Sequence, residues 1–291
     1  MTGARRFAAP PGGQLTEEMQ AAFADDGFLI LDGFASAETT AALRARTAEL
    51  IAGFDPDSVR SVFAAGAGPQ HRDAWFRGSG REIRFFFEAG AFDDAGRLTR
   101  DKAVALNKIG HALHDFDPVF AGFSRAPELA AVAEGLGLVD ADLVQSMLIL
   151  KPPAIGGAVD MHQDATFLHT EPVSVIGFWL ALEDATPDNG GLVAIPGGHR
   201  GGLKARHHYA GADLVTTRLD DTPFAGDPVP LLAPEGTLVV LHGLLPHGSG
   251  PNLSPRPRAA FALHAVDRRA RWSADNWLQL DPARPTRGFR P

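Results

Sequence analysis

The 291-residue chain contains no cysteine. This absence excludes disulfide bonds, a cysteine nucleophile and metal sites built on thiolates. Any metal must therefore be bound by histidine, aspartate or glutamate side chains. A chain without cysteine is compatible with a reducing compartment, and we expect a cytoplasmic protein.

Long hydrophobic runs and an excess of positive charge are also lacking. No run of eighteen apolar residues occurs, so we expect no membrane span. Acidic residues outnumber basic ones, 35 to 27, and the net charge of −8 disfavours binding to nucleic acid. Composition says little about a small-molecule site, where a few local charges decide. Apolar residues make up 45% of the chain, which is enough for a sizeable core.

The first fourteen residues, MTGARRFAAPPGGQ, are interpreted as a flexible tail. Two arginines are present, but the apolar stretch of a secretory signal is missing before Pro10. The remainder, residues 15–291, is expected to form a single domain, because no linker, internal repeat or low-complexity segment divides it.

The N-terminal half is predicted to be largely helical. Apolar residues at helical spacing predict one helix over 15–25, capped by Thr16, and another over 36–54, capped by Ser36. The segment GFLILDGF between them is typical of a short buried strand. Two further short helices are predicted around NKIGHALHDFD and APELAAVAEGL. The run Phe85 to Phe87 is expected to be a strand buried in the core.

After Leu138 the pattern changes to short strands. Gly, Pro, Asn and Asp clusters separate the strand-like segments VQSMLILKPP, VSVIGFWLALED, GLVAIPGGH, GTLVVLHG and RAAFALHAVD. Many short strands with few helices predict an antiparallel barrel or sandwich. We therefore expect a mainly β protein with flanking helices and a helical N-terminal part.

His162 and Asp164 lie two residues apart in GAVDMHQDATFLHTEP, a segment that has strand-like parts. In a strand, residues i and i+2 point to the same side, so both side chains could bind one metal ion. A hydrogen-bonded pair without metal is the alternative. We expect the third ligand to be His247, on a Gly/Pro-rich turn, with His242 at the end of the preceding strand as the rival.

Two histidines and one carboxylate leave three positions on an ion open, as in non-haem Fe(II) oxygenases. These ligand types do not exclude zinc or manganese. Arg258 begins the last strand, eleven residues after His247. Its planar fork suits a carboxylate, such as the distal one of 2-oxoglutarate. The alternative is a structural ion pair between Arg258 and an acid such as Asp267.

The chain resembles the phytanoyl-CoA dioxygenase family, and especially its small members, the phytanoyl-CoA dioxygenase domain-containing proteins. The resemblance covers roughly residues 25 to 280 and rests on motifs that occur in order along the chain: DGFLILDGF, REIRFFFEAGAFD, NKIGHALHDFDPVF, VQSMLILKPP, HQDATFLHTEP, GFWLALEDATPDNGGL, IPGGH, HGSGPNLSPRPR and NWLQL.

This resemblance implies a double-stranded β-helix, a jelly roll of the cupin type. It also implies oxygenase chemistry with Fe(II), 2-oxoglutarate and O2, in which a substrate C–H bond is hydroxylated and succinate and CO2 are formed. The implied iron ligands are His162, Asp164 and His247. Arg258 is the implied anchor of the distal carboxylate, and the implied lining of the cosubstrate pocket consists of Lys108, Met147, Trp179 and Ser249, with backbone contacts from Gln163.

Several points stay open at the level of the sequence. Lys108 could instead be a solvated helix lysine. A cupin-type hydrolase or isomerase with another divalent metal, or a non-catalytic metal-binding relative, are the alternative functions. The substrate is expected to be a small molecule, anionic or acyl-CoA-like, and residues 55–82 and 200–230 are expected to form the mouth and lid of its site. The oligomeric state is undetermined by the sequence.

Overall fold

The computed structural model of the chain describes residues 3–63 and 74–290. In these ranges the helices are α1 (Glu17–Asp26), α2 (Ala37–Gly53), α3 (Ala74–Arg77), α4 (Leu113–Phe116), α5 (Pro118–Ser124) and α6 (Pro127–Gly135), with the 3-10 helices η1 (Pro11–Gly13), η3 (Lys102–Val104), η4 (Asp164–Thr166), η5 (Pro187–Asn189) and η6 (Gly198–Gly201). The strands are β1 (Phe7–Ala8), β2 (Phe28–Asp32), β3 (Ile83–Phe87), β4 (Leu106–His111), β5 (Ala141–Lys151), β6 (Val159–His162), β7 (Thr170–Glu171), β8 (Ile176–Ala181), β9 (Leu192–Ala194), β10 (Ala205–Ala210), β11 (Asp213–Arg218), β12 (Val229–Leu231), β13 (Leu238–His242), β14 (His247–Ser249), β15 (Arg258–Asp267) and β16 (Arg271–Trp272).

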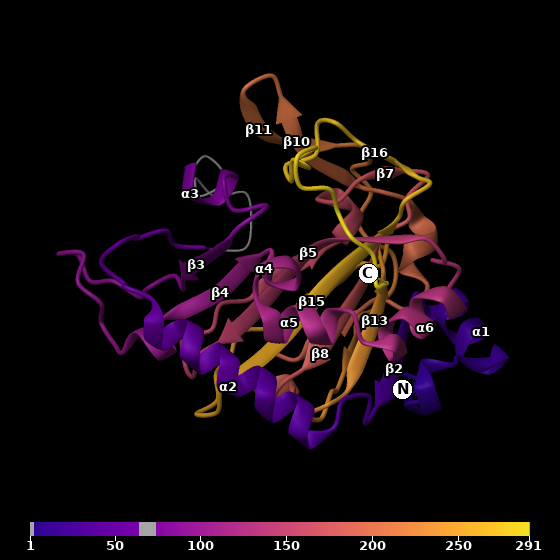
Figure 1. Cartoon of the computed structure of the whole chain (residues 1–291), viewed down its shortest axis with the longest axis horizontal. Helices are drawn as coiled ribbons and strands as arrows, with labels where there is room; N and C mark the ends of the chain where they lie inside the picture. The colour runs from indigo at the N-terminus through magenta and orange to yellow at the C-terminus, as the bar shows by residue number, and fades with distance from the viewer. Residues whose placement is uncertain (1–2, 64–73, 291) are drawn as a thin grey trace.

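Two sheets form the centre of the fold. The larger has eight strands in the order β1-β2-β13-β8-β15-β5-β4-β3, and the smaller has four in the order β12-β9-β14-β6. Neighbouring strands are antiparallel, except that β1 pairs with β2 in parallel. Helices α2, α4 and α5 lie across one face of the large sheet (Figure 1). The expected jelly roll, mainly β with flanking helices, is confirmed.

The strands of the large sheet divide their side chains between two cores. Leu29 and Leu31 of β2 join the cluster that packs under the helices, whereas Phe28 and Ile30 join a second cluster. This alternation follows from the two-residue repeat of a strand. The second cluster also contains Leu192 of the small sheet, so it fills the space between the two sheets. The metal-binding candidates described below belong to this inner space.

The first two predicted helices are confirmed together with their caps. The Thr16 hydroxyl accepts a hydrogen bond from the Met19 amide at the start of α1. Ser36 accepts one from Thr39 at the start of α2. The helix predicted around APELAAVAEGL is also confirmed, as α6.

One predicted helix is wrong. The residues NKIGH belong to the strand β4, which lies between β3 and β5, and only the short α4 follows. His111 therefore packs inside the fold, with its Nδ1 2.8 Å from the Ser79 hydroxyl. The segment was misleading because it is short and of mixed polarity, and a short segment does not distinguish a buried strand from a helix. The strand with Phe85 to Phe87 is confirmed: Phe86 and Phe87 are buried, whereas Phe85 is only half-buried.

Part of the predicted flexible tail is attached to the large sheet. Phe7 and Ala8 pair with Leu31 and Asp32 of β2, and the Arg6 guanidinium binds the Asp32 carboxylate. The free edge of β2 offers backbone groups that this short strand satisfies. Residues 1 and 2 lie outside the described part of the chain.

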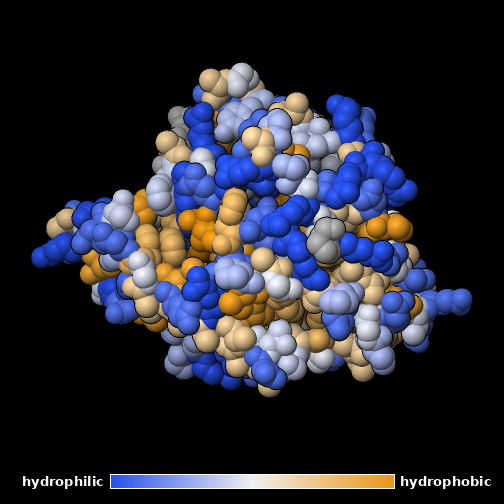
Figure 2. Space-filling view, in the orientation of Figure 1, coloured by the Kyte–Doolittle hydropathy of each residue, from blue (hydrophilic) through white to orange (hydrophobic). Residues whose placement is uncertain are grey.

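The two segments predicted to form the mouth differ in structure. Residues 205–218, within the segment 200–230, form the β10–β11 hairpin, which projects from the body of the molecule (Figure 1). Of the segment 55–82, residues 64–73 are outside the described ranges. In the surface view, apolar residues gather where Figure 1 draws β3 and β4 (Figure 2). Among the helices described, none has the length and apolar character needed to cross a membrane.

Candidate metal centre

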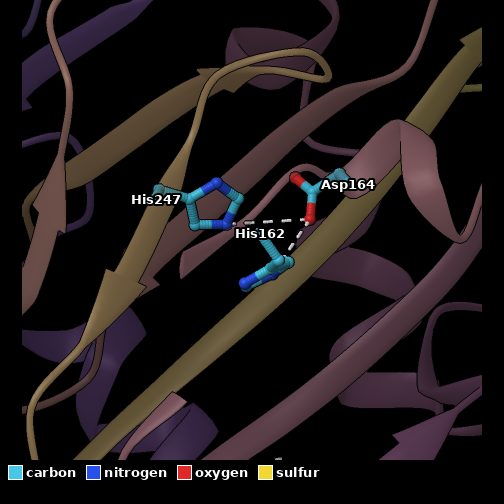
Figure 3. A group of neighbouring side chains, drawn as sticks. All are labelled: His162, Asp164 and His247. Carbon is cyan, nitrogen blue, oxygen red and sulfur yellow. Dashed lines mark ion pairs between the residues drawn. The ribbon is translucent and has the colours of Figure 1, made fainter. Parts of the chain in front are cut away.

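The smaller sheet brings two of the predicted ligands together. His162 ends β6 and lies opposite His247, the first residue of β14, in the antiparallel register of the two strands. The sequence pattern predicted that Asp164 continues the strand, and this is wrong. Asp164 begins the 3-10 helix η4. The turn into η4 still points its carboxylate toward the two imidazoles (Figure 3).

The distances between the three side chains are those of a metal site. The Asp164 Oδ1 atom lies 3.8 Å from His162 Nε2 and 3.7 Å from His247 Nε2. One ligand atom from each of the three residues lies within 4.8 Å of the others. Because metal–nitrogen and metal–oxygen bonds are about 2.0–2.2 Å long, one ion between the three atoms fits these separations.

Backbone carbonyls orient both imidazoles. His162 Nδ1 lies 2.8 Å from the Asp160 carbonyl oxygen, and His247 Nδ1 lies 3.0 Å from that of Leu245. A proton on each Nδ1 satisfies these acceptors and leaves the Nε2 lone pairs free for a metal. This arrangement, in which the second ring nitrogen is bound by a protein acceptor, is typical of metal-ligating histidines.

The electrostatics keep His162 and Asp164 in their metal-binding protonation states. Burial and the neighbouring His247 lower the pKa of His162 to about 4, so its imidazole is neutral at pH 7. Burial raises the pKa of Asp164, but the His247 and His264 imidazoles lower it more, and the carboxyl is ionised. The His162 side chain is 26% exposed, whereas those of Asp164 and His247 are 9% and 7% exposed, so the site opens beside His162.

The rival ligand His242 lies elsewhere. Its ring centroid is 6.1 Å from that of Phe23 and 5.0 Å from that of His199. It does not belong to the metal-binding group found among the described residues. The geometry therefore favours His247 over His242 as the third ligand.

Arg258 is the largest fully buried side chain of the described residues, with 1% of its surface exposed. Its guanidinium lies 5.5 Å from the Trp179 ring centroid, while Nε and Nη1 have no hydrogen-bond partner among the described residues. Burial lowers the pKa of Arg258 to about 10, although Glu183 and Glu88 raise it, and the group is still charged at neutral pH. A buried cation with unsatisfied N–H groups is costly alone and fits an anion.

The alternative partner of Arg258 is wrong. Asp267 is at the opposite end of β15 and pairs with Arg269 at 2.7 Å. The neighbour of Arg258 across the strand pair is Lys151, whose ammonium donates hydrogen bonds to the carbonyl oxygens of Gly157 and Gly250. The Lys151 ammonium therefore links the loops beside β6 and β14 through these hydrogen bonds. It leaves the Nε and Nη1 donors of Arg258 without a partner among the described residues.

Two other predicted pocket residues lie in one row of the large sheet. Met147 of β5 and Trp179 of β8 are both register partners of Ala262 on β15, and both belong to the core between the sheets. Ser249, on β14 of the facing sheet, is buried as well. Met147 and Trp179 therefore belong to the space between the sheets, the Arg258 guanidinium lies beside the Trp179 ring, and Ser249 follows His247 by two residues on β14.

The alternative for Lys108 is wrong, and Gln163 makes side-chain contacts that the sequence did not indicate. Lys108 is no solvated helix lysine: it lies on β4, is 6% exposed, and its Nζ is 3.3 Å from the Phe63 ring centroid. The Gln163 side chain donates to the carbonyl oxygens of Gly202 and Leu244 and accepts from the Lys204 amide. Gln163 thus fixes the loops around the site with its side chain.

A cavity of about 480 Å³ lies on the other face of the large sheet, between α2 and η3. Ala48 and Ile51 of α2 and Val104 of η3 contribute to its walls. Arg258 also contributes to its walls, but none of the three metal-ligand candidates does, so this cavity is separate from the triad.

Sequence reasoning missed His264. This side chain is buried on β15, six residues after Arg258, and its Nε2 lies 3.4 Å from Asp164 Oδ2. The signal was the two-residue repeat of the strand, which places Arg258, Ala260, Ala262 and His264 on one face.

The jelly roll, its two-histidine, one-carboxylate site and its relatives define the chain as a 2-oxoglutarate-dependent iron dioxygenase by class. The sequence pattern of the family described as phytanoyl-CoA dioxygenase (PhyH) matches residues 23–260. The chain therefore belongs to the phytanoyl-CoA dioxygenase family.

Individual relatives match over nearly their whole length. The chain is 45% identical to phytanoyl-CoA dioxygenase 1 of Oryza sativa subsp. japonica, over 93% of this chain and 96% of the relative. It is 42% identical to phytanoyl-CoA dioxygenase domain-containing protein 1 of Bos taurus, over 90% and 94%.

Two solved structures share the fold at low sequence identity. The non-heme alpha ketoglutarate dependent carbocyclase SnoK is 16% identical, with a TM-score of 0.65 and coverage of 98% of this chain and 97% of its own. EctD from S. alaskensis, solved with 2-oxoglutarate and 5-hydroxyectoine, is 22% identical, with a TM-score of 0.63 and coverage of 97% and 86%.

Proposed function

We propose that the chain hydroxylates a C–H bond of a small molecule, with Fe(II) held by His162, Asp164 and His247 and with 2-oxoglutarate as cosubstrate. One observation carries the proposal. Close to the core between the two sheets lie a metal-binding triad and, beside Trp179, the buried Arg258 guanidinium, whose Nε and Nη1 have no hydrogen-bond partner among the described residues. Bound Fe(II) would supply the activation of O2 that is coupled to decarboxylation of 2-oxoglutarate to succinate and CO2.

Each group of the chain has a task that follows from its chemistry. The two neutral imidazoles and the carboxylate hold the metal with a net charge of −1 from the protein. Arg258 binds the distal carboxylate of the cosubstrate through its free N–H donors. Met147, Trp179 and Ser249 line the space between, and the buried Trp179 and Ser249 keep water away from it.

The presence of the Asp164 carboxylate supports hydroxylation as the outcome, because a third protein ligand fills the position that a halide would need. The names of the relatives point to an acyl-CoA, and an anionic acyl-CoA-like molecule is the substrate class we propose to test first. A hydrolase or isomerase with the same ligands would have no use for the buried Arg258, so the oxygenase is the better account of the site.

The direct test is succinate release. Purified protein with Fe(II), 2-oxoglutarate and air is expected to form succinate, slowly without substrate and faster with a substrate. Protein loaded with Zn(II) is expected to form none. Succinate formation that is equal with and without Fe(II), or activity that needs only Zn(II), would contradict the proposal.

Lys108 allows a prediction about stability. Burial lowers its pKa to about 7, whereas the unfolded chain keeps it near 10.4. Between these values the unfolded state binds the extra proton, so Lys108 lowers the free energy of unfolding at pH 7, and this cost diminishes as the pH rises from 7 to 10.4. The Lys108→Met variant is expected to unfold with a free energy about 1 kcal/mol higher at pH 7, with a smaller gain near pH 10.

Urea unfolding at both pH values measures this difference. Lys204→Met is the matched control, because the Lys204 ammonium is paired with Asp220, and no gain is expected. The same Lys108→Met protein should need more 2-oxoglutarate if Lys108 lines the cosubstrate pocket. If the 2-oxoglutarate concentration needed for half-maximal turnover is unchanged, Lys108 does not line that pocket.

A further inference from the structure

The two oxygens of Asp164 face different imidazoles. Oδ1 is the atom nearest to Nε2 of both His162 and His247, at 3.8 and 3.7 Å. Oδ2 faces His264 instead, with its Nε2 3.4 Å away. His264 is 5% exposed and has no place in the proposed ligand set.

The fold makes room for this contact. Gly177 on β8 is the register partner of His264 on β15. A Cβ atom at Gly177 would lie 3.0 Å from Asp164 Oδ2 and 3.5 Å from His264 Nε2, so any side chain there would press on the pair. The pairing of β15 with β5 also shifts register between His264 and Ala265. Such a bulge re-aims a side chain and is common beside functional sites.

Two polar atoms at this contact lack hydrogen-bond partners among the described residues. Asp164 Oδ2 and His264 Nδ1 are buried, and neither has a hydrogen-bond partner among the described residues. A buried carboxylate oxygen without a donor is costly. The His264 imidazole, with a proton on Nε2, is placed to supply that donor after a small shortening of the 3.4 Å separation.

We propose that His264 is a positioning residue that holds Asp164 Oδ2 away from the metal, so that the carboxylate binds through Oδ1 alone. This inference rests on the proposed function. A carboxylate can bind a metal through one oxygen or two, and the second mode would occupy one of the three positions that the triad leaves open. Holding Oδ2 therefore keeps those positions for the cosubstrate and O2.

Co(II) binding to the purified protein, followed anaerobically by absorption, tests the role without relying on turnover. His264→Leu removes the donor and is expected to weaken Co(II) binding roughly 10–100-fold and to alter the Co(II) spectrum. His264→Gln retains an N–H group in a similar position and is expected to stay within a few-fold of the unmodified protein. Gly177→Ala, which presses on Oδ2, is expected to weaken Co(II) binding as well.

Val266→Ala is the control for loss of packing. Val266 is buried two residues further along β15, and its truncation should lower the melting temperature without changing Co(II) affinity. Equal Co(II) affinity and spectrum for His264→Leu and the unmodified protein would overturn the inference, as would equal losses for the Leu and Gln variants. If the unmodified protein binds no Co(II), the proposed metal centre itself fails, which is a different result.

Discussion

His162→Ala is expected to abolish succinate formation. His162 ends β6, and its Nε2 lone pair faces the Asp164 carboxylate across a gap that fits one ion. Removing it leaves one histidine and one carboxylate, which hold a divalent ion weakly. Loss of a residue that only supports a metal ligand costs roughly 10–100-fold in affinity, so loss of a ligand should cost at least about 100-fold. Anaerobic Fe(II) titration and the succinate assay measure the two effects.

His242→Ala is the control for this experiment. His242 ends β13 of the larger sheet and was the rival ligand by sequence, but its ring lies beside Phe23 and His199. Its truncation is expected to leave Fe(II) affinity and succinate formation unchanged. If His242→Ala lowers Fe(II) affinity as strongly as His162→Ala does, the third ligand is His242 and His247 has been assigned wrongly. Turnover retained in His162→Ala would remove His162 from the metal centre.

Much of this site could be predicted because its residues carry local signals. The pair His162 and Asp164 is close in sequence, and Arg258 begins a strand that is marked by a nearly continuous apolar run. The register that aligns β6 with β14 carries no such signal, because it depends on pairing between segments more than eighty residues apart. His247 could be preferred over His242 only through its turn context and the family resemblance.

The errors also have physical causes. The residues NKIGH were predicted as helix because a short segment of mixed polarity lacks a decisive period. Burial between β3 and β5 determines the strand, and only the tertiary structure supplies it. His264 was missed because its importance lies in one contact with Asp164, and Gly177, which permits the contact, lies on a third element, β8. Contacts of this kind become visible only when the strands are assembled.

Arg258→Gln is expected to weaken 2-oxoglutarate binding by roughly 30-fold or more. A buried charge pair that loses one member costs about 2–5 kcal/mol, and the guanidinium is the partner that the described residues leave unsatisfied. Arg258→Lys keeps the charge but loses the planar fork, so its effect should be intermediate. Fe(II) affinity should be unchanged in both variants, since Arg258 is absent from the metal-binding group.

Stability separates an anchor from a structural residue. Without cosubstrate, Arg258 is a fully buried cation whose Nε and Nη1 lack acceptors, so replacing it by Gln should leave the melting temperature of the unliganded protein equal or higher. Saturating 2-oxoglutarate should then stabilise the unmodified protein but not the variant. Arg268→Gln, at an exposed position just after β15, is the control and should behave as the unmodified protein. Parallel losses of melting temperature, Fe(II) affinity and cosubstrate affinity in Arg258→Gln would show that the guanidinium supports the fold. A residue that only binds the cosubstrate does not stabilise the unliganded protein, so its replacement should not lower the melting temperature before the anion is bound.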